Sequence, residues 1–252
     1  MKNKQILQIG FLSICLLFLG IQTRGQVQFP RQGKIEFEKK LNIHKEIEGD
    51  SFYDSFKDKI SKFQTTYFNL YFKDGKTLYE KGKDLNEKIM FWSDDETTDD
   101  IVYSDLDNGT FVKKQKVFEE TFLISDSIRF IKWQITSETR DIAGFNCRKA
   151  TGIILDSVYV IAFYTDQIPV SGGPLSYAKL PGMIMGIAIP RMNLTIMATK
   201  LEMIEPKPEK LVPPAPGRAK KANYAGVIDQ LRKSSLSGWG SYGRKYLLKS
   251  LL

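Results

Sequence analysis

Apolar and polar residues alternate along most of residues 33–205, and turn-forming residues interrupt the alternation at short intervals. Residues 34–38, for example, place charged and apolar side chains in alternation. A period of two is typical of strands that bury one face and expose the other. The pattern therefore predicts antiparallel β-structure over this part of the chain.

Two dipeptides mark predicted hairpins, because glycine adopts positive φ without steric cost and favours a tight turn between paired strands. They are Asp74-Gly75, between runs 67–72 and 76–80, and Asn108-Gly109, between runs 101–105 and 110–118. Further strands are predicted at 129–138 and 145–154, joined by a turn at 139–144, and at 158–165. A last strand, 194–203, changes the parity of its apolar residues near Thr199. That change predicts a β-bulge or a sheet edge.

Two segments have helical spacing. Residues 51–63 place Phe52, Phe56, Ile60 and Phe63 on one helical face. Residues 219–233 predict a short basic helix that packs through Tyr224, Val227, Ile228 and Leu231. Between the β-region and this second segment, residues 206–216 are rich in proline, which prevents regular helix or ladder formation and predicts a stiff connector.

These elements predict a mostly β (α+β) fold. We expect a curved antiparallel sheet or half-open barrel with one packed helix, followed by a Pro-rich, basic C-terminal tail. The chain divides into a signal peptide at 1–25, a β domain at 26–205, and the connector and tail at 206–252. A mature chain of this length can bury a substantial core without disulfides.

The N-terminus has the three-part layout of a secretory signal peptide. Lys2 and Lys4 precede an apolar core at 9–21, and residues 23–25 supply a cleavage region. An uncleaved anchor is the alternative, although this core is shorter than the ~20 residues of a membrane-spanning helix. We predict export to the periplasm or to the periphery of the outer membrane.

The net positive charge of the chain narrows the class of molecule that we expect it to bind. The formal charge of +8 falls to +5 without Lys2, Lys4 and Arg24, and much of the remaining excess lies near the C-terminus. An exported chain does not meet nucleic acid, so we expect no nucleic-acid partner. An anionic membrane surface or an outer-membrane protein, bound through residues 219–252, suits the basic tail better. A disordered tail with no partner is the alternative.

The most unusual segment is an apolar run that proline and glycine interrupt. It comprises Gly173, Pro174, Leu180, Pro181, Gly182, Met183, Ile184 and Met185, with Lys179 before Leu180 and Gly186 and Ile187 after Met185. Residues 133–136, 142–150 and 162–169 precede it in a consistent order. Together these blocks resemble the GLPGLI family of exported Bacteroidetes proteins, whose biochemical role the motif does not establish. Lys179 stands where the family has its first glycine.

Two roles are open for this motif segment. Its proline and glycine residues make it a poor helix or strand, so we expect an irregular insert that crosses an open sheet and packs on its apolar face. Alternatively, the same residues line a cleft for an apolar ligand.

Signatures of catalysis are missing. His44 is the only histidine, which excludes a zinc site or catalytic triad that needs several. Cys147 precedes Arg148 and Lys149, which would lower the pKa of an exposed thiol. A buried, structural cysteine is the simpler interpretation. No residue pattern predicts a metal or a cofactor.

We therefore predict a noncatalytic binding or accessory protein of the cell envelope, for an apolar ligand, a peptide or an outer-membrane partner. The alternative from another class is an envelope hydrolase that uses Cys147 or a pair of carboxylates.

Overall fold

The computed structural model describes residues 29–49, 57–83, 99–117, 120–233 and 248–252. The predicted signal peptide lies outside these residues. The strands are β1 (Gly33–Asn42), β2 (Phe63–Lys73), β3 (Lys76–Lys81), β4 (Ile101–Asp105), β5 (Thr110–Val117), β6 (Glu120–Ser127), β7 (Gln134–Ile142), β8 (Phe145–Ile154), β9 (Val158–Thr165), β10 (Met183–Ile189), β11 (Leu194–Glu202) and β12 (Lys220–Ala222). The helices are α2 (Ile43–Glu46) and α4 (Tyr224–Lys233), with 3-10 turns η1 (Lys57–Lys59), η3 (Pro190–Met192) and η4 (Pro208–Lys210).

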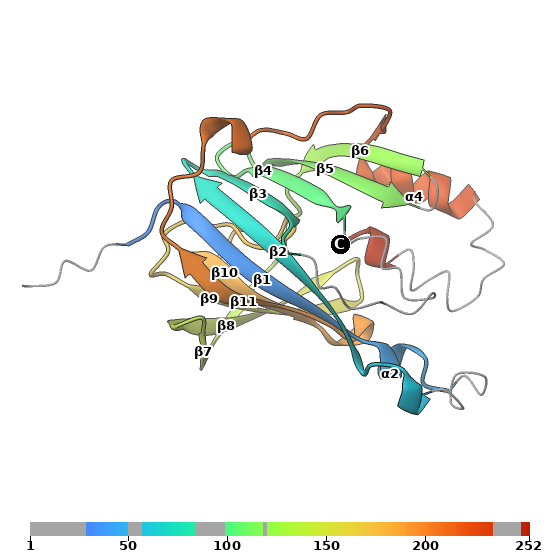
Figure 1. Cartoon of the computed structure of the whole chain (residues 1–252), viewed down its shortest axis with the longest axis horizontal. Coiled ribbons are helices and arrows are strands. Elements are labelled where there is room, and N and C mark those ends of the chain that lie inside the picture. The colour runs from blue at the N-terminus through green and yellow to red at the C-terminus, as the bar shows by residue number, and fades with distance from the viewer. Residues whose placement is uncertain (1–28, 50–56, 84–98, 118–119, 234–247) are drawn as a thin grey trace, which may run out of the picture.

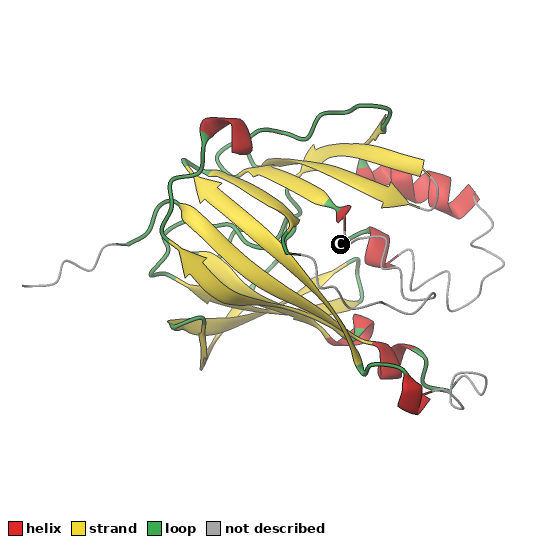
Figure 2. Cartoon of the chain, viewed as in Figure 1, coloured by secondary structure: helices red, strands yellow, loops and turns green. Residues whose placement is uncertain are grey.

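The described strands form one 12-stranded sheet in the order β12-β6-β5-β4-β3-β2-β1-β11-β10-β9-β8-β7. All neighbours pair antiparallel except β12 and β6, which are parallel. The sheet is open and strongly curved, so that β3–β6 face β7–β11 across its interior (Figures 1 and 2). The prediction of a mostly β fold with a curved antiparallel sheet is confirmed.

Local sequence signals place several turns correctly. Asp74 and Gly75 both have positive φ, 48° and 69°, between β2 and β3. Gly109 has φ 66° between β4 and β5. The predicted bulge is also confirmed, because the register between β1 and β11 passes over Thr199. The Thr199 hydroxyl donates a hydrogen bond of 2.8 Å to the Glu36 carboxylate across this bulge.

Two local predictions were wrong. Residues 57–63 are not helical: Lys57–Lys59 is a 3-10 turn, and Phe63 already belongs to β2 because it pairs with Asn42 along the full length of β1. The rest of that predicted helix, 50–56, lies outside the described residues. Residues 128–133 are not a strand. They cross the sheet interior irregularly, where Ile128 and Ile131 are buried.

The turn after this segment also differs from the prediction at 139–144. Strand β7 continues to Ile142, and the turn consists of Ala143 and Gly144, whose φ values are 51° and 82°.

The sheet interior is filled by four segments: 128–133, 166–182, α4 and 248–252. Helix α4 begins at Tyr224 and not at residue 219 as predicted, because Lys220–Ala222 pairs with β6 as β12. Val227 and Leu231 of α4 are buried in the main core, as the helical spacing predicts. Tyr224 packs against Phe111 of β5, with ring centroids 5.3 Å apart. These contacts remove apolar surface from water and close much of the concave face.

The residues after β11 run back across the outside of the sheet. We call residues 205–222 the strap. Glu205 binds Lys73 of β2 at 2.6 Å, and Lys210 pairs with Glu80 of β3. Leu211 packs with Leu78 and Tyr103 on the outer face of β3 and β4.

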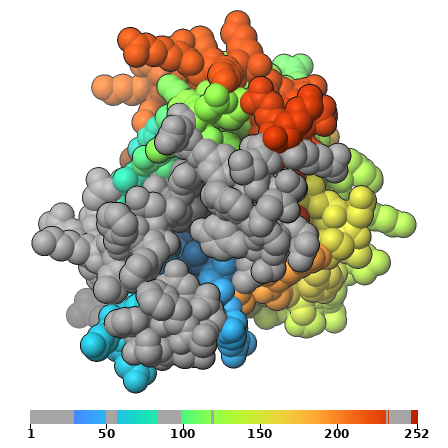
Figure 3. Space-filling model, turned by 90° about the vertical axis from the view of Figure 1, so that its right-hand side faces the viewer, coloured from blue at the N-terminus to red at the C-terminus, as the bar shows by residue number. Residues whose placement is uncertain are grey.

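The strap ends at the far edge of the sheet. The Lys114 ammonium of β5 donates to the Ala215 carbonyl at 3.3 Å, and β12 then pairs with β6. Figure 1 shows the orange strap running along the side of the sheet that carries β5 and β6, and in Figure 3 orange atoms lie next to green ones at the top of the molecule. The chain then passes to the interior as α4. The domain boundary after Glu205 stays a prediction, although the described residues beyond it pack on the same sheet.

No helix within the described ranges has both the length and the apolar character needed to span a bilayer.

Candidate functional site

The residues of the motif divide between a loop and a central strand. Met183, Ile184 and Met185 belong to β10, between β9 and β11, and are fully buried. The expectation that this run would not form a strand was wrong. Strand β10 is apolar on both faces because the interior segments cover one face, while Ile142 and Met197 pack against Gly186 on the other.

The preceding residues do form an irregular insert on the inner face. Leu180 is buried in the main core, and Gly173 lies so close to Ile184 that a Cβ atom would approach its Cβ to 2.7 Å. Pro174 is buried beside Gly173, whereas Pro181 is exposed. The Trp133 indole, on the interior segment 128–133, donates to the Ala178 carbonyl at 3.1 Å and tethers the insert. These side chains fill the interior around the motif.

Backbone geometry explains the glycine positions. Gly182 has φ 140°, and a Cβ atom there would lie 2.1 Å from the Thr165 carbonyl oxygen. Lys179 has φ 69°, a left-handed conformation that glycine adopts more easily than lysine. The residue in the first motif position therefore carries backbone strain, which a glycine would avoid.

Cys147 is buried among its own strands. Its side chain is 0% exposed on the outer face of β8, and its thiol donates weakly to the Phe145 carbonyl at 3.4 Å. Burial, with the nearby Asp141 carboxylate as a smaller cause, raises the pKa of the thiol to about 12. Arg148 does not offset this effect. The predicted burial of Cys147 is confirmed.

His44, the single histidine of the sequence, makes a contact with the backbone. It lies in α2, where its Nε2 donates to the Ile60 carbonyl at 2.8 Å. Across the described ranges, no three His, Cys, Asp or Glu residues gather as a metal site would require.

A buried ion pair lies in the interior that the curved sheet encloses. The Lys113 ammonium of β5 is 3.1 Å from the Asp100 carboxylate, with side-chain exposures of 2% and 1%. Both residues, with Lys39, Leu175 and others, border a space of about 20 Å³. A space of that size holds about one water molecule, so it is too small for a substrate.

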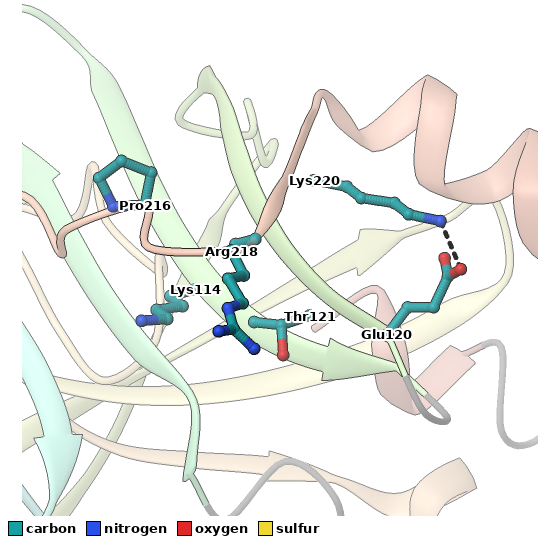
Figure 4. Close-up of a pocket in the computed structure, with 7 residues that line it drawn as sticks. Lys114, Glu120, Thr121, Pro216, Arg218 and Lys220 are labelled. Carbon is teal, nitrogen blue, oxygen red and sulfur yellow. Dashed lines mark hydrogen bonds and ion pairs between the residues drawn. The ribbon is translucent and has the colours of Figure 1, made fainter.

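A larger hollow lies on the outer face, where the strap meets β5 and β6. It has a volume of about 380 Å³ and is lined by Lys114, Glu120, Thr121, Pro216, Arg218, Ala219 and Lys220. Figure 4 shows Arg218 extending over the strands toward Thr121, with Lys114 on the neighbouring strand. We call this hollow the strap groove.

A tight turn positions Arg218. The Ala219 amide donates to the Pro216 carbonyl at 2.9 Å, and Gly217 between them has φ 52°. A hydrogen-bonded turn with positive φ at its second residue suits glycine. The turn leaves Arg218 exposed at the rim of the strap groove.

The strap groove is electropositive. Glu120 is its one lining carboxylate and pairs with Lys220. Among the described residues, Lys114 donates to the neutral Ala215 carbonyl, which does not compensate its charge. Lys116, exposed on β5 opposite Thr121, adds a further cation beside the lining residues.

The sequence prediction did not identify this groove. A Pro-Gly turn and alternating lysines on β5 were visible as signals. However, the groove joins residues about 100 positions apart, and the course of the strap over the sheet cannot be derived from local pattern.

The chain is similar to a known protein family and to solved structures. Residues 53–223 match the family model described as "N-glycanase peptide, N-terminal domain". Two solved structures of PNGF-II, in space groups C2 and P21, are similar at 17% identity with TM-scores of 0.52 and 0.53. Each aligns with 81% of this chain but with only 33% and 34% of its own chain, so this chain spans about a third of those proteins. No curated protein matches the chain.

At this identity the solved structures show a shared fold and nothing further. The family match, in contrast, covers more than half of the sequence. The chain therefore belongs to the family of N-glycanase peptide N-terminal domains.

Proposed function

We propose that this chain is an exported, noncatalytic binding module of the cell envelope, which attaches to an anionic surface through the strap and the residues beside it. The observation that carries the proposal is the strap groove. Its volume is about 380 Å³, and its lining holds three cations and one carboxylate. The resemblance to the GLPGLI family stays a prediction.

The motif offers less support for a ligand carrier. Leu180 and the β10 residues Met183, Ile184 and Met185 are buried against their own chain. An apolar ligand would have to displace this packing, at a cost comparable to creating a cavity in a core. An apolar pocket therefore has no place beside the motif in the described arrangement.

The hydrolase alternative has little support from Cys147. A nucleophilic cysteine needs a lowered pKa, and burial raises this one. The name of the family refers to an N-glycanase. Since this chain corresponds to about a third of the PNGF-II chains, we propose that any glycanase activity belongs to parts that this chain does not include.

Vesicle binding and glycan release together test the proposed function. The full chain, produced with its N-terminal segment in an exporting host, is mixed with phosphatidylcholine vesicles that contain or lack phosphatidylglycerol. We expect co-sedimentation with the anionic vesicles only, and a loss of binding as salt rises, because exposed charges are screened within about 10 Å at 0.1 M salt.

The same preparation is incubated with a denatured N-glycosylated protein, and released glycan is measured. We expect no release above buffer. Equal binding to both vesicle types, or no binding to either, would contradict the binding role. Glycan release that survives purification to homogeneity would favour the hydrolase alternative.

A further inference from the structure

We infer that the strap groove recognises a phosphate group, as carried by an anionic lipid headgroup. This inference rests on the proposed attachment to an anionic surface and assigns the contact to particular side chains. The assigned donors are the Arg218 guanidinium, the Lys114 ammonium and the Thr121 hydroxyl, all of which line the strap groove.

The positive charge of the strap groove favours an anionic ligand. Within the described part of the chain, Arg218 forms no hydrogen bond and no ion pair, and it is exposed. The partner of Lys114 is a neutral carbonyl, while Lys220 neutralises Glu120. Two cations therefore border the hollow without a carboxylate of their own, and a bound anion would compensate them.

The chemistry of the donors favours phosphate. Arginine presents a planar fork of N–H donors that matches phosphate oxygens in pairs, and lysine adds a point charge. A hydroxyl donor such as that of Thr121 can satisfy a further oxygen. The hollow of about 380 Å³ accommodates a headgroup rather than a single ion.

The scaffold holds these donors on ordered elements. Lys114 lies on β5 and Thr121 on the adjacent strand β6, where Thr121 pairs with Lys116, two residues beyond Lys114. Arg218 is held by the turn that the Ala219 amide closes. Pairing of β12 with β6 fixes the end of this turn against the sheet. Little ordering of the groove is then needed on binding, which lowers the entropic cost of association.

A double substitution tests the inference. Lys114→Gln/Arg218→Gln removes both uncompensated charges. The matched control Lys132→Gln/Arg148→Gln removes one exposed lysine from the segment 128–133 and one exposed arginine from β8. We expect the groove variant to bind phosphatidylglycerol vesicles about 30-fold more weakly and the control to bind within about twofold of the wild type. Circular dichroism and thermal unfolding of each variant show that it is folded.

A single substitution separates phosphate recognition from general attraction. Arg218→Lys keeps the charge but loses the planar fork. We expect it to weaken binding of pyrophosphate, measured by titration calorimetry, while it retains part of the vesicle binding.

The pyrophosphate titration also identifies the source of the phosphate. Binding of both pyrophosphate and vesicles supports a lipid headgroup, and binding of pyrophosphate alone supports a free phosphate ligand and contradicts membrane attachment. Wild-type vesicle binding that the groove variant retains would overturn the inference and the assignment of the contact to the groove, but would leave attachment to an anionic surface standing. Absence of vesicle binding in the wild type would overturn the proposed function itself.

Discussion

Lys113 and Asp100 form an ion pair of 3.1 Å inside a β-sheet whose interior is otherwise mostly apolar. Lys113 lies on the inner face of β5, opposite Ile124 of β6. Burying either charge alone costs several kcal/mol, so each side chain makes the position of the other tolerable. The pair thereby links β5 to the residue that precedes β4.

Removing the ammonium tests this link. Lys113→Met leaves the Asp100 carboxylate in the interior and is expected to lower the free energy of unfolding by about 3 kcal/mol. The adjacent outward-facing substitution Lys114→Met is the control, with an expected change within about 0.5 kcal/mol. Urea unfolding measures both.

The double variant Lys113→Met/Asp100→Leu completes the test. It should be more stable than Lys113→Met alone, because no carboxylate remains in the interior. If the loss of stability in the double variant equals the sum of the losses in Lys113→Met and Asp100→Leu, the two side chains are not coupled.

Gly182 is predicted to be the most sensitive glycine of the motif. Gly182→Ala would drive a Cβ atom to 2.1 Å from the Thr165 carbonyl oxygen, at φ 140°. We expect a loss of at least about 3 kcal/mol or failure to fold. Gly144→Ala, at φ 82° with no atom within 4 Å of its Cβ, should cost only about 1 kcal/mol. Equal effects in thermal unfolding would show that the close approach at Gly182 is unimportant.

Cys147 gives a pH-dependent prediction. Burial raises the pKa of its thiol from 9.0 to about 12. Between these values the unfolded chain loses the thiol proton and the folded chain keeps it, so stability falls as pH rises above 9. Below pH 9 the thiol is protonated in both states and has no such effect.

The expected slope from this one group is about 1.4 kcal/mol per pH unit. It is measured as the difference between wild type and Cys147→Ala in urea unfolding at successive pH values above 9. The thiol should also resist iodoacetamide in the folded protein and react in urea. Rapid alkylation of the folded protein, or identical pH dependence in the two proteins, would contradict the assignment of Cys147 to the core.

Substitutions at two neighbouring residues of the strap test whether it packs stably against the outer face of the sheet. Leu211 is 8% exposed against Leu78 and Tyr103, and Val212 is 49% exposed. Leu211→Ala should destabilise the protein by about 2 kcal/mol, and Val212→Ala by less than about 0.5 kcal/mol. Thermal unfolding measures the difference. If both changes are neutral, the strap does not contribute to the stability of the sheet.

The sequence predicted those features of the fold that local chemistry determines. Asp74-Gly75 and Asn108-Gly109 turn where their backbone preferences require, and the parity change at Thr199 marks a real bulge. Helix α4 follows from the spacing of Val227 and Leu231. The burial of Cys147 follows from the general behaviour of unpaired cysteines.

Features set by tertiary structure were harder to predict. Strand β10 is buried on both faces, so it lacks the alternation that identifies a strand. Phe63 belongs to β2 because of pairing with Asn42, which no local pattern encodes. Lys179 shows the reverse case: glycine would suit this position better than lysine, but the reason is visible only once the φ of 69° is known.

The strap groove was beyond sequence reasoning for the same reason. Lys114 and Arg218 approach one hollow only because the strap crosses the outer face and turns at Gly217. The basic character of the C-terminal region was evident from composition, but the place where it acts depends on the register of β12 with β6.

The most direct test of the account is hydrogen–deuterium exchange of the full chain with and without phosphatidylglycerol vesicles. We predict slower exchange on vesicle binding in peptides that cover residues 114–121 and 216–222, and no change in residues 183–189 of β10. Protection confined to β10, or to β8 and β9 on the opposite half of the sheet, would contradict the assignment of binding to the strap groove.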